Sequence, residues 1–161
     1  MTTHKRSLSF LLILSALMAF TSLSTDIYLP AMPTMEKQLG GNAELTITGF
    51  LTGFAIAQLI WGPISDRIGR KLPLFIGMVL FVIGSVGCAL SESMSAVVFW
   101  RIFQAVGACV GPMLSRAMIR DSFAQSQAAQ MLSTLTIIMA IAPIAGPFIG
   151  GGLLKVASWH W

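Results

Sequence analysis

The sequence predicts an all-α membrane protein with about five membrane-spanning helices. Of its 161 residues, 55% are hydrophobic and only 10% are charged, whereas about a quarter of the residues of a typical soluble domain are charged. Its mean hydropathy is +0.81, and its charges gather in short segments between long apolar runs. Such a composition suits lipid, because a protein surrounded by hydrocarbon must be apolar on its outside as well.

Five apolar stretches are long enough to cross about 30 Å of hydrocarbon, which takes roughly 20 helical residues. In order, they are 8–29, 45–64, 72–90, 96–115 and 131–154. Pro30 and Pro33 follow the first, a charged segment follows the second, and SESMS and IRDSF follow the third and fourth. A signal peptide would also combine a basic start with an apolar middle, but this run is too long and four more follow. We therefore expect one membrane domain over residues 1–161.

The distribution of lysine and arginine orients the spans, because cytoplasmic loops carry an excess of both. With the N-terminus inside, only Lys37 and Lys155 lie outside, and Arg101 lies within a span. The cytoplasmic set is Lys5, Arg6, Arg67, Arg70, Lys71, Arg116 and Arg120. Seven basic residues against two predict a cytoplasmic N-terminus.

The segment GPISDRIGRK, residues 62–71, concentrates four charges in a chain that has few. A cytoplasmic turn explains its basic residues, but not an aspartate directly before Arg67 or two glycines seven residues apart. The segment resembles the loop G-x-x-x-D-R-x-G-R-K between helices 2 and 3 of the major facilitator superfamily. The matching residues are Gly62, Asp66, Arg67, Gly69, Arg70 and Lys71.

Three further segments resemble the same superfamily, in the same order. STDIYLPAMP is similar to the end of helix 1 in drug:proton antiporters, through Asp26 and Pro30. RIFQAVGACVG is similar to the helix 4 motif R-x-x-Q-x-x-G, through Arg101, Gln104 and Gly107. APIAGPFIGG resembles the helix 5 antiporter motif, although Ala142 replaces its first glycine. That segment supplies Pro143, Gly146, Pro147, Gly150 and Gly151. Together the four segments look most like the Bcr/CflA drug-resistance branch.

The resemblance implies two six-helix halves around a central cavity, of which this chain holds most of the N-terminal one. It implies proton-coupled efflux of cationic or amphipathic drugs across the bacterial inner membrane. The proton gradient takes the place of a cofactor, and the partners are the drug, protons, the lipid bilayer and the missing C-terminal half. Two alternatives stay open: a truncated membrane polypeptide without transport activity, and a metabolite transporter on the same fold, which GPFIGG disfavours.

Two ionisable residues lie within the predicted spans, where such groups often mark ion pathways. Asp26 is three residues and Arg101 five residues from the outer ends of their spans. At ~1.5 Å per residue, both lie less than about 8 Å deep on the same side. We expect them to meet as a proton-coupling pair, with Gln104 in the same motif. Alternatively, Asp26 is an interfacial residue that caps the following loop, and Arg101 is a structural partner of a helix carbonyl or of Gln104.

Charged residues also meet at the cytoplasmic ends of the second and fourth spans. We expect Asp66 to pair with Arg70, Arg120 or both, and Asp121 to be a second acid for Arg70. Such a cluster can form when an inner gate closes and break when it opens.

Glycines of the fifth span leave a surface that another helix can approach closely, and its prolines Pro143 and Pro147 favour a bend. For this span the resemblance adds a role in sealing the two halves against proton leak. Gly49/Gly53 and Gly107/Gly111 repeat the G-x-x-x-G spacing. Ordinary helix packing is the alternative for all three sets.

Other classes of function find no support in the sequence. It has no G-x-x-x-x-G-K-[ST] loop for ATP, since GGGLLK does not fit it. It has no nucleophile–base constellation, no spacing for metal ligands, and no basic face with aromatics for nucleic acid. His4 and His160 lie near the termini, and Cys88 and Cys109 are expected to be free thiols. We therefore expect neither an enzyme nor a nucleic-acid-binding protein.

Overall fold

The computed structural model describes residues 2–153, and it describes side chains for residues 10–19 and 21–153. Lys155 and His160 lie outside the described residues. His4, Lys5 and Arg6 belong to α1, but their side chains are not described. Within residues 2–153 every regular element is helical. The elements are α1 (Thr2–Asp26), η1 (Leu29–Ala31), α2 (Met32–Leu39), α3 (Glu44–Ile68), α4 (Lys71–Ala89), α5 (Met94–Ala108), α6 (Val110–Ser122) and α7 (Gln125–Leu153).

In the described part of the chain, five helical segments are long and apolar enough to cross a membrane, which confirms the predicted fold class. They are Phe10–Leu39, Glu44–Ile68, Lys71–Ala89, Met94–Ser122 and Gln125–Leu153. Most extend beyond the predicted spans, because backbone hydrogen bonding continues where the apolar run stops. Pro30 and Pro33 do not end the first segment. Each stands in the first turn of a new helical element, where its missing N–H would have no partner in any case.

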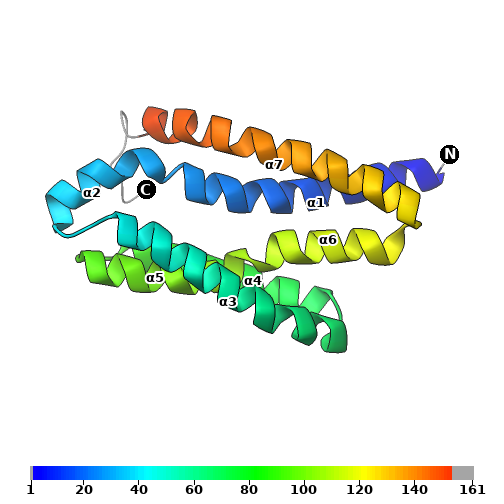
Figure 1. Ribbon diagram of the computed structural model, residues 1–161, viewed down its shortest axis with the longest axis horizontal. Helices are drawn as coiled ribbons and strands as arrows, with labels where there is room; N and C mark the ends of the chain where they lie inside the picture. Colours follow the sequence, from blue (N-terminus) through cyan, green and yellow to red (C-terminus); the bar gives the residue numbers. More distant parts are fainter. Residues whose placement is uncertain (1, 154–161) are drawn as a thin grey trace.

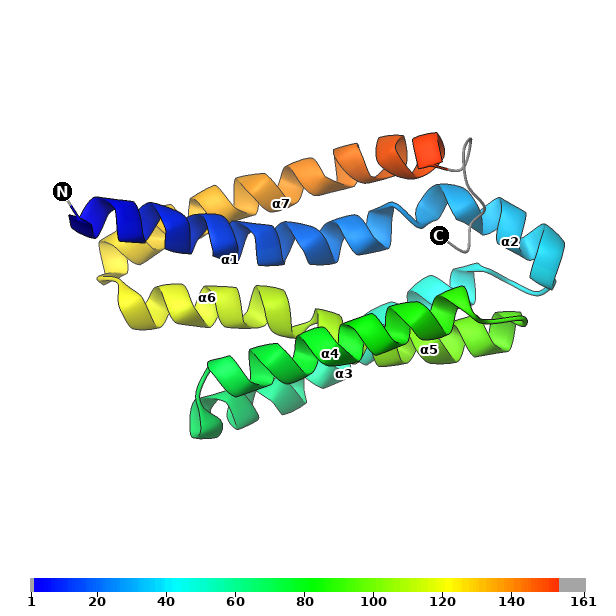
Figure 2. The ribbon, with the colours of Figure 1, turned by 180° about the vertical axis from the view of Figure 1, so that it is seen from behind.

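The helices form two groups that α6 connects. Helix α7 packs along α1, while α5 packs against both α3 and α4. Helix α6 leaves the second group and runs beside α1 (Figure 1). The reverse view shows the same arrangement (Figure 2). The α3–α4 link and the α6–α7 link lie at the end of the bundle where α1 begins, so the predicted cytoplasmic segments share one end.

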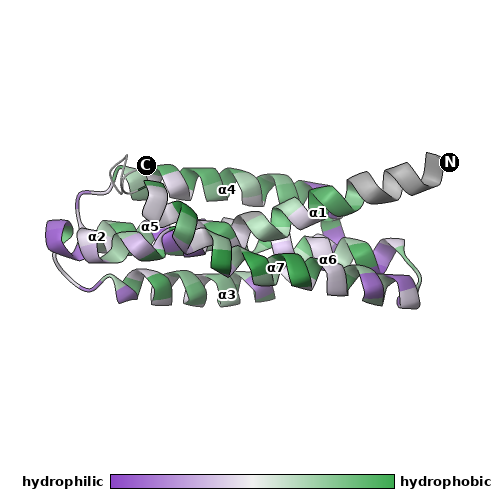
Figure 3. Cartoon of the chain, turned by 90° about the horizontal axis from the view of Figure 1, so that it is seen from above, coloured by the Kyte–Doolittle hydropathy of each residue, from purple (hydrophilic) through white to green (hydrophobic). Residues whose placement is uncertain are grey.

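The outer surface is largely apolar. Hydrophilic residues gather mainly towards the two ends of the bundle, and apolar residues cover the length between them (Figure 3). Large side chains such as Phe148, which is 81% exposed, and Leu59, which is 78% exposed, face outward. An apolar outer surface of this kind is favourable in contact with lipid and unfavourable in contact with water.

Glycines on α4 allow α5 and the start of α6 to pack unusually close. A Cβ on Gly84 would lie 2.6 Å from the Cα of Gln104, and one on Gly77 would lie 2.7 Å from Val110. The predicted glycine pairs also serve packing within the chain: Gly53 meets Ile102, and Gly107 meets the backbone of α4. Close approach of this kind is the usual basis of helix association in membranes.

The fourth span breaks at Cys109, between α5 and α6. Pro112 causes the break, since it has no N–H for the carbonyl of Ala108 four residues earlier and its ring crowds that carbonyl. The hydroxyl of Thr21 on α1 donates to this carbonyl at 3.2 Å. The indole of Trp61 on α3 donates to the neighbouring Val106 carbonyl at 3.0 Å. Side chains from two other helices therefore satisfy backbone groups at the break.

We expect Thr21→Val to lower the free energy of unfolding by about 0.5–1.5 kcal/mol, because the Ala108 carbonyl loses its donor. In a Pro112→Ala background the restored amide can serve Ala108, so the same change should cost less. Unfolding of the purified chain in mixed detergent micelles, analysed as a double-mutant cycle, measures this difference. Thr25→Val is the matched control, since the Thr25 hydroxyl bonds within its own helix. An equal cost in both backgrounds would contradict the explanation.

Candidate functional site

The half of the bundle away from the start of α1, which is predicted to be the outer (non-cytoplasmic) half, contains a buried arginine. Arg101 lies on α5 and is only 7% exposed. Its Nη1 donates to Oε1 of Gln104 at 2.9 Å, because a spacing of three residues places both on one helix face. Nε2 of Gln104 donates in turn to the Ser85 hydroxyl on α4 at 2.7 Å, and Ser85 donates to the carbonyl of Phe81. Hydrogen bonds thus connect the cation to the backbone of α4.

An aromatic ring, not a carboxylate, faces the guanidinium. The Cζ atom of Arg101 lies 3.8 Å from the ring centre of Tyr28 and 5.9 Å from that of Phe50. A desolvated contact of the closer kind is worth about 2 kcal/mol. The Tyr28 hydroxyl is 2.9 Å from Oγ1 of Thr46 on α3. Among the described residues no acid forms an ion pair with Arg101, so ring and amide stabilise its charge.

The expected meeting of Asp26 with Arg101 is wrong for this conformation. Asp26 is the last residue of α1, and its Cβ lies so close to Gly146 of α7 that a Cβ there would clash. Asp26 and Arg101 were predicted to lie at similar depth in the membrane. However, the Asp26 side chain leaves α1 towards α7, and it is Tyr28, in the turn after α1, that contacts Arg101. The alternative for Arg101, a pair with Gln104, is confirmed.

Asp26 has no hydrogen bond or ion pair with any residue that the structure describes. The alternative interpretation, that Asp26 caps the loop that follows α1, is therefore also wrong for the described residues. The carboxyl stands at the carbonyl end of a helix, where the helix dipole disfavours a negative charge. The structure brings together Arg101 and Gln104, and it leaves Asp26 apart.

The predicted ion pairs at the inner end are confirmed. Nη1 of Arg70 lies 2.6 Å from Oδ1 of Asp66, and its Nε lies 3.1 Å from Oδ2 of Asp121. Nη1 also donates to the Ser65 hydroxyl at 2.8 Å. Burial would lower the pKa of the Arg70 guanidinium, but the hydrogen bonds and charges of both aspartates outweigh it and raise that pKa. Gly69 has φ of 86°, a conformation that glycine adopts without strain.

A cavity of about 440 Å³ opens beside this ion-pair cluster. Arg120 lines it but forms no ion pair with a described residue, so Asp66 pairs with Arg70 and not with Arg120. Gly62 also lines it, and a Cβ there would meet no atom within 4 Å. Arg67 and Lys71 are exposed and form no ion pair within the described residues. Of the predicted gating residues, three form the cluster and the others surround it.

The glycines of α7 pack against α1 of this same chain. A side chain on Gly146 would strike Asp26, and one on Gly150 would strike the carbonyl of Ile27. Gly151 faces open space, and α7 is assigned as one helix through Pro143 and Pro147. Gly146 and Gly150 therefore contact residues of this same half, and only Gly151 of the three leaves open surface for another helix.

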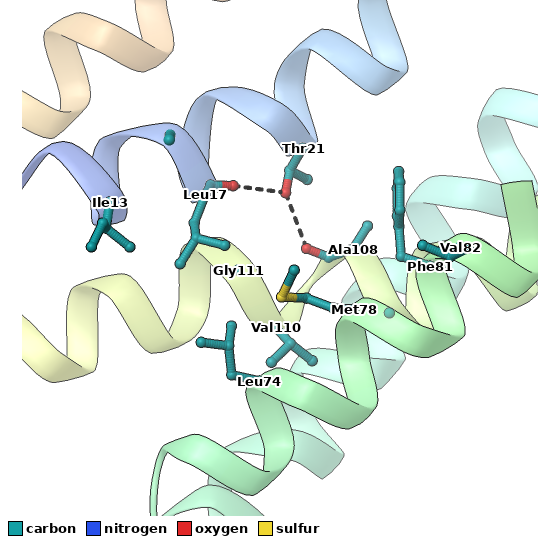
Figure 4. A pocket seen from close by; sticks show the side chains of 12 residues that line it. Ile13, Leu17, Thr21, Leu74, Met78, Phe81, Val82, Ala108, Val110 and Gly111 are labelled. Atoms are coloured by element: carbon teal, nitrogen blue, oxygen red, sulfur yellow. Dashed lines mark hydrogen bonds between the residues drawn. The ribbon is translucent and has the colours of Figure 1, made fainter.

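A second cavity of about 390 Å³ lies between α1, α4 and the break in the fourth span (Figure 4). Its walls are apolar, and Thr21 crosses it to reach Ala108. Sequence reasoning missed Thr21, Ser85 and Tyr28. Tyr28 is the only tyrosine of the chain, and its place two residues after Asp26 was the available signal. No three His, Cys, Asp or Glu side chains of the described part lie close enough together to hold a metal ion.

Comparison with known proteins gives a consistent result. The sequence profile of the Major Facilitator Superfamily matches residues 12–161. YdgK, an uncharacterized MFS-type transporter of Bacillus subtilis, is 39% identical over 98% of this chain and 40% of its own length. The bicyclomycin resistance protein homolog of Haemophilus influenzae is 31% identical over 99% of this chain and 41% of its own length. Multidrug resistance protein D of Escherichia coli is 29% identical, with coverages of 98% and 40%. The chain thus spans about two fifths of these curated relatives.

The inner ion pairs should contribute little to stability. Asp66 and Asp121 are 65% and 54% exposed, and exposed pairs are worth about 0.2–1 kcal/mol. We expect Asp66→Asn and Asp121→Asn each to lower the free energy of unfolding by that amount, and the loss to shrink at about 1 M salt. Unfolding in detergent at two salt concentrations measures it. Arg67→Gln serves as the control, and a salt-independent loss above about 2 kcal/mol would contradict this explanation.

Proposed function

The chain belongs to the Major Facilitator Superfamily, and on that premise we propose that it forms most of the N-terminal half of a drug exporter driven by protons. The observation that carries the proposal is the pair of ionisable groups at the outer end of the bundle. Arg101 is buried without a counter-ion, and Asp26 ends α1 without a partner among the described residues. Such groups are costly inside a membrane and commonly belong to ion or substrate pathways.

Proton coupling would reside in Asp26. A carboxylate without a counter-ion can bind either a proton or a cationic drug. A protonated carboxyl is neutral and attracts a cation only weakly, so proton and drug compete for the same group. Drug would bind in the central cavity between the two halves and leave as a proton replaces it. Arg101 and Gln104 would set the positive potential near this exchange. No cofactor is needed, because the proton gradient supplies the free energy.

The ion-pair cluster of Asp66, Arg70 and Asp121 would serve as part of the inner gate. Its members come from the end of α3, the α3–α4 link and the end of α6. Because the two acids are mostly exposed, breaking the pairs costs little free energy. A gate needs contacts of this strength, since it must open and close in each transport cycle.

We propose that the protein lies in the bacterial inner membrane with its N-terminus in the cytoplasm. Support comes from the described basic residues at the end of the bundle where α1 begins (Figure 1). They are Arg67, Arg70, Lys71, Arg116 and Arg120. Lys37, near the end of α2, lies at the opposite end.

The partner of this half would be the remainder of a longer transporter, since the resistance proteins that it resembles are about two and a half times its length. An inert truncated polypeptide is the rival. The nucleotides that follow the codon for Trp161 separate the two: an open frame of similar length or more supports the transporter, and an immediate stop supports the rival. A metabolite transporter on the same fold would show uptake or exchange of a metabolite and no drug efflux.

Expressed alone, the 161-residue chain should confer no drug resistance, because alternating access needs a second half to close the cavity. Drug susceptibility of a pump-deficient host that produces the chain measures this. Immunodetection in the membrane fraction is the control for expression. Reproducible resistance from the chain alone would contradict the expectation.

In the full transporter, Asp26→Asn should abolish proton-driven export of tetraphenylphosphonium while the protein still inserts and folds. Asparagine keeps the size of aspartate but cannot change its charge, so drug and proton no longer exchange. Efflux from energised vesicles, normalised to expression, measures the loss. Glu44→Gln is the matched control, since Glu44 is an exposed acid at the same end of the bundle. Normal export by the Asp26→Asn protein would remove Asp26 from the coupling mechanism.

A further inference from the structure

Tyr28 is close to Asp26 in the sequence and contacts Arg101. It follows Asp26 by two residues, in the turn where the amide of Ile27 donates to the carbonyl of Leu23 and that of Ala31 donates to Tyr28. Its ring centre is 3.8 Å from Cζ of Arg101. Asp26 meanwhile packs against α7. The ring therefore occupies the position beside the guanidinium that a carboxylate would be expected to take.

The ring is held in place by a second contact. Its hydroxyl bonds to Thr46, which is fully buried and donates in turn to the carbonyl of Ala43. A guanidinium stacks well on an aromatic face, and the contact is strongest when both are desolvated. The anchored ring is thus a fixed, uncharged partner for a cation that is 7% exposed.

We propose that Tyr28 is a positioning residue that holds Arg101 away from Asp26 and so keeps the Asp26 carboxyl free for protons and cationic drugs. This inference rests on the proposed exchange at Asp26. Without the ring, Arg101 keeps Gln104 but loses its closest aromatic partner, and the Asp26 carboxylate, predicted to lie at similar depth, is the strongest alternative for the guanidinium. Pairing would then stabilise the charged form of Asp26 and repel a cationic drug.

Helices α6 and α7, which pack on α1, offer Asp26 no other cation at this end, and Lys37 of α2, which does lie at this end, is exposed. Helix α7, which packs against Asp26, has no ionisable residue between Gln125 and Leu153. The ionisable residues of α6, which also packs on α1, lie between its middle and its inner end. Those residues are Arg116, Arg120 and Asp121. Arg101 is therefore the buried cation whose contacts would change on loss of the ring.

The experiment measures proton release from the purified full transporter in detergent when tetraphenylphosphonium is added, as a function of pH. Tyr28→Leu and Tyr28→Met both remove the ring, and each should shift the midpoint of release towards acid by about one pH unit or more, because a nearby arginine keeps a carboxyl ionised to lower pH. Tyr28→Phe keeps the ring and should keep most of the original midpoint. Using two ringless variants guards against one that fails to fold.

A double variant identifies the cause of the shift. Adding Arg101→Gln to Tyr28→Leu should remove the acid shift, whereas a general packing defect would persist. Phe99→Leu, an exposed aromatic on the same helix as Arg101, should leave the midpoint unchanged. If the unaltered transporter releases no protons on drug binding, the proposed exchange fails. If it does release them and the ringless variants keep its midpoint, only the role of Tyr28 is overturned.

Discussion

The buried charge of Arg101 is the interaction on which the outer half of the bundle depends. A guanidinium inside a membrane protein must keep partners, because leaving it unpaired in hydrocarbon costs several kcal/mol. Here the partners come from three other segments: the turn after α1 supplies Tyr28, α3 supplies Phe50, and α4 reaches it through Ser85 and Gln104. A single cation thereby fixes how four parts of the chain meet.

The break at Cys109 divides the fourth span into parts with different neighbours. The outer part, α5, packs against α3 and α4, which approach closely through glycines such as Gly84. The inner part, α6, runs beside α1, and Ser115 donates to the carbonyl of Leu14. Because Pro112 prevents the backbone from closing the break, side chains of other helices must satisfy it. The arginine site and the inner ion pairs consequently belong to two differently supported halves of one span.

The charged residues at the two ends of the bundle have opposite surroundings. At the inner end, Arg70 is bound by two exposed acids, so water competes for every partner and the contacts are weak. At the outer end, Arg101 is buried with neutral partners, and Asp26 has no partner among the residues that the structure describes. Weak, charged contacts fit the proposed role of the inner cluster as a gate, and a carboxyl without a described counter-ion fits the proposed role of Asp26 in proton exchange.

The sequence by itself predicted the five spans and a charged inner end where Asp66, Arg70 and Asp121 meet, because length, hydropathy and position at a span's end are properties of local sequence. It left open whether Asp66 pairs with Arg70, Arg120 or both, and the tertiary structure selected Arg70. The sequence also placed Asp26 and Arg101 at similar depth. Only the tertiary structure decided that they do not meet, since depth says nothing about the direction in which a side chain leaves its helix. That direction depends on which helix packs where: α7 takes up the face that carries Asp26, and the turn after α1 brings Tyr28 to Arg101.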